Sequence, residues 1–204
     1  GWAFEEVIAH QDPRQGVVVR VQTPDGGRHV GARLLVDGMG ATSPLALGAQ
    51  PFSGLCPTVG TVVRGVADHD PSVGDILISI ADSQGERQLI WEGFPGRDGE
   101  LTVYVFYYDQ TGARAQHTHS LLDLYEDYFA LLPTYKQPGP DFAHERPVYG
   151  YIPGRHSIKR PLPLQGVLAV GDASAQQSPL TFCGFGSFIR NLARTVDGAD
   201  RLLK

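Results

Sequence analysis

The first half of the chain reads as short apolar runs separated by turns. Residues 16–23 and 28–36 are two such runs, and Pro, Asp, Gly and Gly lie between them at 24–27. Apolar runs on both sides of a glycine-rich turn are typical of a β-hairpin. The second run ends in Asp37 and Gly38, and loop-forming residues follow to about position 55.

Four further apolar runs are separated by Ser, Gln, Gly, Asp and Pro, and they predict an antiparallel meander. These runs are residues 60–66, 75–80, 87–94 and 101–108. A helix is expected next, with Ser120 as its N-cap and Asp123 three residues later. Its apolar side chains recur at helical spacing and should cover one face of the sheet. They are Leu121, Leu124, Tyr125, Tyr128 and Leu132. Pro133 is expected to end this helix.

The last third of the chain begins with a proline-rich stretch. Residues 136–163 predict irregular chain, apart from a short strand at 148–152. A strand at 166–170, a loop and a helix from about Phe185 to Leu203 follow. The predicted fold class is α+β, with a parallel-type strand on each side of an antiparallel insert.

Composition limits the kind of protein. Of 204 residues, 42% are hydrophobic, which is enough for a packed core. The net charge of -5 comes without a basic run, which argues against nucleic acid as a partner. No apolar run approaches the roughly 20 residues of a transmembrane segment, although peripheral membrane contact stays open. Two cysteines, Cys56 and Cys183, do not make a disulfide framework, so a cytoplasmic location is expected.

The strand at 167–170 ends in Gly171 and Asp172, and this is where chemistry is expected. Ligands of open α/β sheets bind outside the carboxyl ends of the strands. An ionised carboxylate there can accept hydrogen bonds from sugar hydroxyls. Gly184 and Gly186 then open the last helix, whose first backbone N–H groups lack intrahelical partners and favour an electron-rich group.

The string VLAVGDASAQQSPLTFCGFGSFIRNL, residues 167–192, resembles the second FAD-binding motif of a large flavoprotein group. This group includes aromatic hydroxylases, geranylgeranyl reductases and lycopene cyclases. The resemblance implies that Asp172 binds the ribityl or pyrophosphate part of FAD. It also implies that Pro179 and the turn from Gly184 to Ser187 lie beside the isoalloxazine ring. Cys183 stands where a small residue is expected.

A second string, ARLLVDGMGATSP at residues 32–44, resembles the group's middle Asp-Gly motif. It carries Asp37 and Gly38, which the resemblance places near the pyrophosphate. The implied cofactor-binding set is Asp37, Gly38, Gly171, Asp172, Ala173, Pro179, Gly184, Phe185, Gly186 and Ser187. No G-x-G-x-x-G motif occurs. The resemblance therefore predicts an N-terminally incomplete chain, and a first residue that is Gly1 rather than Met favours the same hypothesis.

The resemblance also implies a domain organisation. Residues 1–50 and 160–204 would be part of an α/β, Rossmann-like FAD-binding domain, and residues 51–159 an inserted antiparallel-sheet substrate domain. An aromatic sheet face within the insert is ordinary core in one interpretation and lines an apolar substrate pocket in the other. Its side chains are Trp91, Phe94, Tyr104, Phe106 and Tyr108, and Tyr149 and Tyr151 are candidates to join them.

The implied activity is that of an FAD-dependent oxidoreductase acting on a small apolar organic substrate, with NADPH or NADH as electron donor. A lycopene-cyclase-like, flavin-assisted isomerase and a non-catalytic remnant that binds no FAD are the alternatives. No catalytic residue is identified, and the oligomeric state stays open. His117 and His119 are the only close histidine pair and lack an adjacent Cys, Asp or Glu ligand, so no metal site is predicted.

Overall fold

The computed structural model describes residues 1–9, 15–45, 52–70, 72–79, 87–114, 120–154, 164–175 and 184–204. The chain divides into two compact units. Unit 1 comprises Gly1–Pro51 and Arg155–Lys204, and unit 2 comprises Phe52–Gly154. In the described ranges, no helix has the length and apolar character needed to span a membrane.

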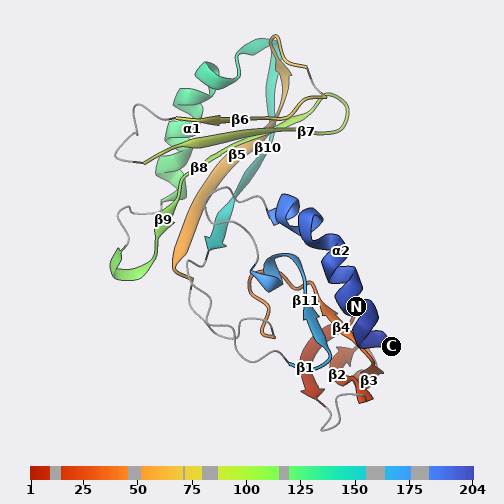
Figure 1. The fold of residues 1–204 in the computed structure, drawn as a ribbon. Coiled ribbons are helices and arrows are strands. Elements are labelled where there is room, and N and C mark those ends of the chain that lie inside the picture. The colour runs from red at the N-terminus through yellow and green to blue at the C-terminus, as the bar shows by residue number, and fades with distance from the viewer. Residues whose placement is uncertain are drawn as a thin grey trace. The chain divides into compact units, whose positions relative to one another are not determined.

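Unit 2 is built on an antiparallel sheet with strand order β10-β5-β8-β7-β6, and β9 also pairs with β5 (Figure 1). Its strands are β5 (Gly54–Val66), β6 (Asp75–Ile78), β7 (Ile90–Pro95), β8 (Leu101–Phe106), β9 (Asp109–Gln110) and β10 (Pro138–Gly154). A 3-10 turn, η2 (Gly112–Arg114), follows β9. The expected meander is therefore confirmed for β6, β7 and β8, whereas β5 pairs with β8 and β10 rather than with β6.

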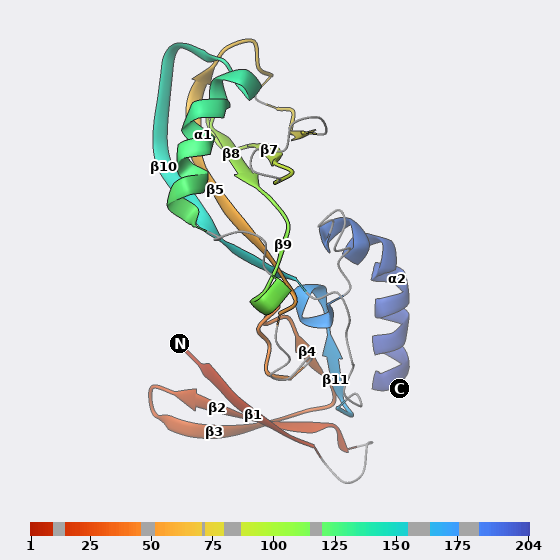
Figure 2. The same cartoon turned by 90° about the vertical axis from the view of Figure 1, so that its left-hand side faces the viewer.

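Helix α1 (Leu121–Tyr135) covers one face of this sheet (Figure 2). The predicted N-cap is confirmed, because Ser120 Oγ accepts a hydrogen bond from the Asp123 N–H at 3.3 Å. Leu124, Tyr128 and Leu132 are buried in a core with sheet residues such as Val59 and Val103. Burial of this apolar stripe is what holds the helix on the sheet.

The prediction that Pro133 ends α1 is wrong, because the helix continues to Tyr135. Pro133 lies in the last turn, where its missing N–H removes a single helical hydrogen bond. The ladder closes beyond it, since the Lys136 N–H donates to the Leu132 carbonyl at 2.8 Å. A proline at this position is therefore tolerated.

The prediction of irregular chain after residue 136 is also wrong. Strand β10 runs from Pro138 to Gly154 and pairs antiparallel with β5, with two register shifts. It is an outer strand of the sheet. Proline cannot donate a ladder hydrogen bond, but an edge strand has one side without a partner, so prolines are accepted there.

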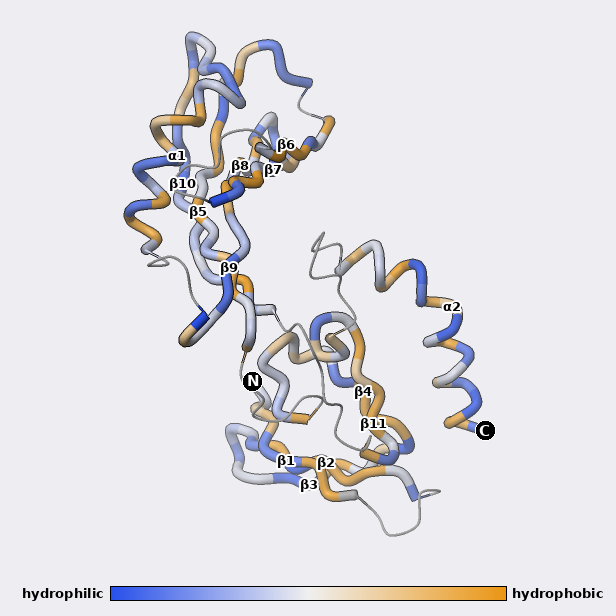
Figure 3. Tube along the Cα trace, turned by 60° about the vertical axis from the view of Figure 1, so that its left-hand side comes forward, coloured by the Kyte–Doolittle hydropathy of each residue, from blue (hydrophilic) through white to orange (hydrophobic). Residues whose placement is uncertain are grey.

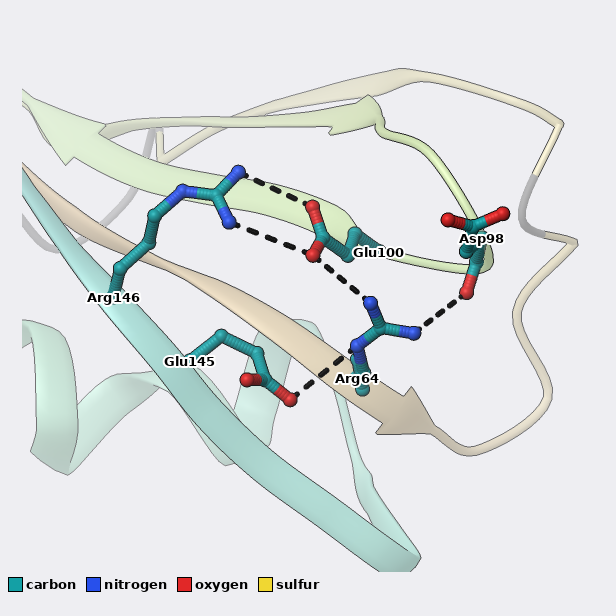
Figure 4. A network of polar contacts seen from close by, with 5 residues as sticks. All are labelled: Arg64, Asp98, Glu100, Glu145 and Arg146. Carbon is teal, nitrogen blue, oxygen red and sulfur yellow. Dashed lines mark hydrogen bonds and ion pairs between the residues drawn. The ribbon is translucent and has the colours of Figure 1, made fainter.

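A polar network ties β10, β5 and β8 together at one end of the sheet. Figure 4 shows the Glu100 carboxylate between the guanidinium groups of Arg64 and Arg146, at 3.0 and 3.1 Å. Arg64 also contacts Glu145 at 3.3 Å and donates to the Asp98 carbonyl at 2.8 Å. Hydrogen bonds from Arg146, followed by those from Arg64, lower the pKa of Glu100. The charges at this end of the sheet therefore balance one another.

Unit 1 contains a three-stranded antiparallel sheet, β1-β2-β3. Its strands are β1 (Ala3–Ala9), β2 (Val17–Thr23) and β3 (Gly26–Ala32). The predicted hairpin is confirmed as β2 and β3, but its second arm ends at Ala32. Strand β1 was not predicted, because Glu5 and Glu6 interrupt its alternation; both carboxylates pair with Arg20 on β2, at 2.7 and 3.0 Å.

The rest of unit 1 consists of β4 (Leu35–Asp37), β11 (Val167–Ala169), the 3-10 turn η3 (Gly171–Ser174) and helix α2 (Gly184–Leu203). Strands β4 and β11 are parallel and apolar (Figure 3). The two strands of this pair are far apart in the sequence, because β4 precedes unit 2 and β11 follows it. Helix α2 begins at Gly184 and has no buried side chain.

Candidate functional site

Strand β4 ends in Asp37, and β11 ends at the same edge of the β4-β11 pair, shortly before Asp172 in η3. Ala169 lies opposite Asp37 in the parallel register. The Val170 N–H then donates to the Asp37 carbonyl at 2.9 Å, so the pairing extends to the last residue before η3. The carboxyl ends of parallel strands are where α/β sheets bind ligands. Asp37 and Asp172, 135 positions apart by their numbers, therefore follow adjacent strand ends.

Asp37 is only 1% exposed, and hydrogen bonds within its own loop occupy its carboxylate. Oδ1 accepts from the Met39 N–H at 3.0 Å, and Oδ2 accepts from Ser43 Oγ at 2.5 Å. A buried carboxylate needs such partners to offset its lost hydration. Asp37 thereby holds the loop of residues 38–43, including Gly38, against the end of β4.

Asp172 has the opposite environment. It is exposed, and its carboxylate makes no hydrogen bond or ion pair with the described part of the chain. Gly171 precedes it with φ +58°, a left-handed conformation that favours glycine. The Ala173 side chain is fully buried and holds the turn in place. The turn η3 thus presents a solvated carboxylate beside the end of β11.

The start of α2 provides the other predicted group. Gly184, Phe185, Gly186 and Ser187 form its first turn, and the N–H groups at the start of a helix have no acceptor one turn earlier in the same helix, as at Gly184 and Phe185. Phe185 is 79% exposed. The Ser187 carbonyl accepts from Asn191 Nδ2 at 2.8 Å, which secures the following turn. Pro179 and Cys183 lie outside the described residues, as do His117 and His119.

Unit 2 divides the predicted aromatic side chains between two sheet faces. Trp91 faces α1, where its ring stacks on Tyr128 at 5.5 Å. The other four form a row on the opposite face, with neighbouring ring centroids 5.7–6.2 Å apart. They are Phe94, Tyr104, Phe106 and Tyr108. The expectation of a single face that includes Trp91 is therefore wrong. Trp91 and Phe94 are an odd number of positions apart on β7, so their side chains point to opposite faces.

A carboxylate lies within this aromatic row. Glu92, on the same face as Phe94, accepts a short hydrogen bond from Tyr104 Oη. Burial, and then Glu92 itself, raise the pKa of Tyr104, so this phenol stays protonated. Sequence reasoning missed the pair, although strand alternation would have placed Glu92 and Phe94 on one face. It also missed Ser43, for which six residues of separation from Asp37 give no local signal.

Comparisons with known proteins give fold relatives only. No family model and no curated protein matches the sequence. A geranylgeranyl bacteriochlorophyll reductase-like protein from Thermoplasma acidophilum has a similar structure, with 17% identity and a TM-score of 0.65 over 95% of this chain and 47% of that one. The flavin-dependent halogenase CmlS has 14% identity and a TM-score of 0.60, over 98% of this chain and 35% of the other.

A flavin-dependent brominase adds a third example, with 14% identity and a TM-score of 0.57 over 98% of this chain and 50% of the brominase. The chain thus spans half or less of the length of each of these structures. At such identities the likeness concerns the fold. Over its described residues, the chain therefore shares its fold with part of each of these three structures.

Proposed function

We propose that this chain is part of an FAD-dependent oxidoreductase that acts on a small apolar organic substrate, and that unit 1 supplies part of the FAD site. The observation that carries this proposal is the solvated Asp172 carboxylate at the carboxyl end of the parallel β4-β11 pair. A group in that position is available to accept hydrogen bonds from hydroxyl groups of a ligand.

The residues of unit 1 fit such a cofactor. FAD, when bound, supplies the hydride and electron transfer that amino-acid side chains cannot perform. Asp172 would hold its hydroxyl or pyrophosphate-linked part, with Gly171 and Ala173 shaping the turn. The first turn of α2, Gly184 to Ser187, would lie beside the ring system, and the N–H groups at its start, of Gly184 and Phe185, would face an electron-rich edge of it. Asp37 would act indirectly, by fixing the loop that begins at Gly38.

We further propose that another α/β element completes this site. Within the described residues, β11 pairs with β4 alone. Purely parallel sheets are normally covered on both faces. In addition, large apolar side chains of α2 are exposed, among them Ile189 and Val196, so this helix has an apolar side that another element could cover. An element that added a parallel strand with a G-x-G-x-x-G turn would supply the phosphate-binding half that residues 1–204 lack.

The aromatic row of unit 2 is the surface that we assign to the substrate. Phe94 is 44% exposed at one end of the row, and Phe106 is buried further along it. Small-molecule sites are lined mostly by apolar and aromatic side chains, with a few polar groups that orient the ligand. Glu92, held by Tyr104, is the polar group of this face and would receive a hydroxyl or N–H of the substrate.

Fluorescence titration with FAD tests the cofactor assignment. FAD binding is compared with and without the Asp172→Ala substitution in two proteins. One is the 204-residue chain, and the other is an N-terminally extended version of it. We expect the extended chain to bind FAD more tightly, and Asp172→Ala to weaken binding by about tenfold, the effect of one lost charge-assisted hydrogen bond. Asp197→Ala is the matched control, because Asp197 is equally solvated but lies far along α2.

Two outcomes would contradict the proposal. An extended chain that takes up no FAD would favour the non-catalytic alternative. Unchanged affinity in Asp172→Ala would remove this residue from the site. The isomerase alternative is separated by following NADPH or NADH during turnover, because an isomerase converts substrate without net consumption of reductant.

A further inference from the structure

Unit 2 contains a cleft that no part of the proposed function uses. It has a volume of about 450 Å³ and lies between α1 and the strands β5 and β10. Leu122, Tyr125 and Phe129 form the α1 wall. Leu122 is 77% exposed and Phe129 is 51% exposed, although both are large and apolar. A concave site of this size with apolar walls is what small ligands occupy.

The floor of the cleft is a chain of hydrogen bonds. Thr61 Oγ1 lies 2.7 Å from Tyr128 Oη and 2.8 Å from His144 Nδ1. Tyr128 is fully buried and has no other acceptor among the described residues, so its proton points to Thr61 Oγ1. Thr61 then donates to His144 Nδ1, which leaves the proton of the neutral imidazole on Nε2.

The His144 ring is held in place before any ligand arrives. Phe129 and Phe142 pack against it edge-on, at 5.3 and 5.0 Å between ring centroids. Burial lowers the pKa of His144, which keeps the imidazole neutral at pH 7. Its Nε2–H is therefore a fixed donor beside the apolar side chains of Leu122 and Phe129.

The charge at the rim indicates a neutral ligand. Arg146 and Glu145 line the rim, and both are already paired, Arg146 with Glu100 and Glu145 with Arg64. The Tyr125 hydroxyl is also used, because it donates to the carbonyls of Gly60 and Val148 at 3.1 and 2.9 Å. The Nε2–H of His144 is thus a donor that remains available to a ligand, and it requires an acceptor.

We propose that this cleft binds a small neutral aromatic carbonyl compound, whose ring lies against Phe129 and Leu122 and whose carbonyl oxygen accepts from His144 Nε2–H. The site shares no residue with the proposed FAD site, and it is separate from the aromatic row, because Thr61 faces α1 and the aromatic row lies on the opposite face of the sheet. This ligand proposal can therefore be tested separately from the proposed function.

Calorimetric titration of the 204-residue chain with acetylnaphthalene and ethylnaphthalene tests the proposal. The two probes share ring and size, and only the first has a carbonyl. We expect acetylnaphthalene to bind about tenfold more tightly, the usual contribution of one hydrogen bond. The NMR signal of the His144 imidazole should shift with acetylnaphthalene in proportion to occupancy.

Two variants assign the preference to its residues. His144→Phe keeps the ring but removes the donor, so both probes should then bind equally. Leu122→Ser should weaken both probes by a similar factor and preserve their ratio, and its exposure makes a folding defect unexpected. His29→Phe, at an exposed histidine of β3, is the matched control and should change nothing. Absence of saturable binding, equal affinities, or a preference that survives His144→Phe would overturn the proposal.

Discussion

Helices α1 and α2 are both amphipathic, yet they use their apolar faces in opposite ways. In α1, Leu124, Tyr128 and Leu132 are buried under the helix. In α2, Ser187, Phe188, Asn191 and Thr195 are half-buried, while the other large apolar side chains are exposed. The exposed set includes Phe185, Ile189, Leu192, Val196 and Leu203. Unit 2 thus contains the cover for its helix, whereas the described part of unit 1 lacks one.

The largest expected effect is on the free energy of unfolding, when the same Leu→Ala substitution is made in each of the two helices. Leu132→Ala should reduce the free energy of unfolding by about 3 kcal/mol, because Leu132 is 2% exposed in a packed core. Leu192→Ala should change it by less than about 0.5 kcal/mol, since Leu192 lies on the open face of α2. Urea unfolding followed by circular dichroism measures both. Equal costs would show that α2 is packed as tightly as α1.

The two aspartates of unit 1 offer the next comparison. Asp37→Ala should cost about 2 kcal/mol, because it leaves the Ser43 hydroxyl and the Met39 N–H without their acceptor. Asp172→Ala should leave stability nearly unchanged, since its carboxylate has no partner in the described part of unit 1. Hydrogen exchange of the loop at 38–43 checks this, with faster exchange expected only in Asp37→Ala. Equal exchange in both variants would contradict it.

A smaller effect concerns the start of α1. Ser120→Ala should cost about 1 kcal/mol, because the Asp123 N–H loses the side chain that caps it. Ser120→Asp should restore most of the loss, since a carboxylate also caps a helix and favours its positive end. The midpoint of urea unfolding measures both variants. An unchanged midpoint in Ser120→Ala would mean that burial alone determines where α1 begins.

The smallest effect is in the dependence of stability on pH. Hydrogen bonds from Arg146 and Arg64 lower the pKa of Glu100 below its ordinary value of 4.5. The carboxylate therefore contributes its full stabilisation above pH 4.5, and this is lost as pH falls through the lowered pKa. Glu100→Gln should flatten that acid limb in unfolding curves. Glu126→Gln, at an exposed position of α1, is the control that should leave it unchanged.

Local signals in the sequence predicted those features that depend on neighbouring residues. Ser120 and Asp123 are three positions apart, so their cap is visible in the sequence. The turn between β2 and β3 is equally local. Strand β10 was missed because its prolines argue against a strand until its edge position is known. That position depends on pairing with β5, in which Tyr149 lies opposite Val59, 90 residues earlier.

The cofactor-binding candidates divide in the same way. The motifs placed Asp37 and Asp172 after apolar strands, and the parallel pairing of β4 with β11 agrees with that expectation. Their different environments could not be predicted, because one carboxylate is covered by Ser43 and the other by nothing in the described residues. Trp91 and Phe94 show a related limit, since strand alternation separates their faces but does not say which face a helix will cover.

By itself, the sequence determined the periods of the strands and helices, the capped start of α1 and the two apolar runs that lead to Asp37 and Asp172. The tertiary structure decided which strands pair, which aspartate is buried and which helix has its apolar side covered. These outcomes depend on contacts between residues far apart in the chain. Burial is a property of the surroundings of a side chain, and only the folded chain brings those surroundings together.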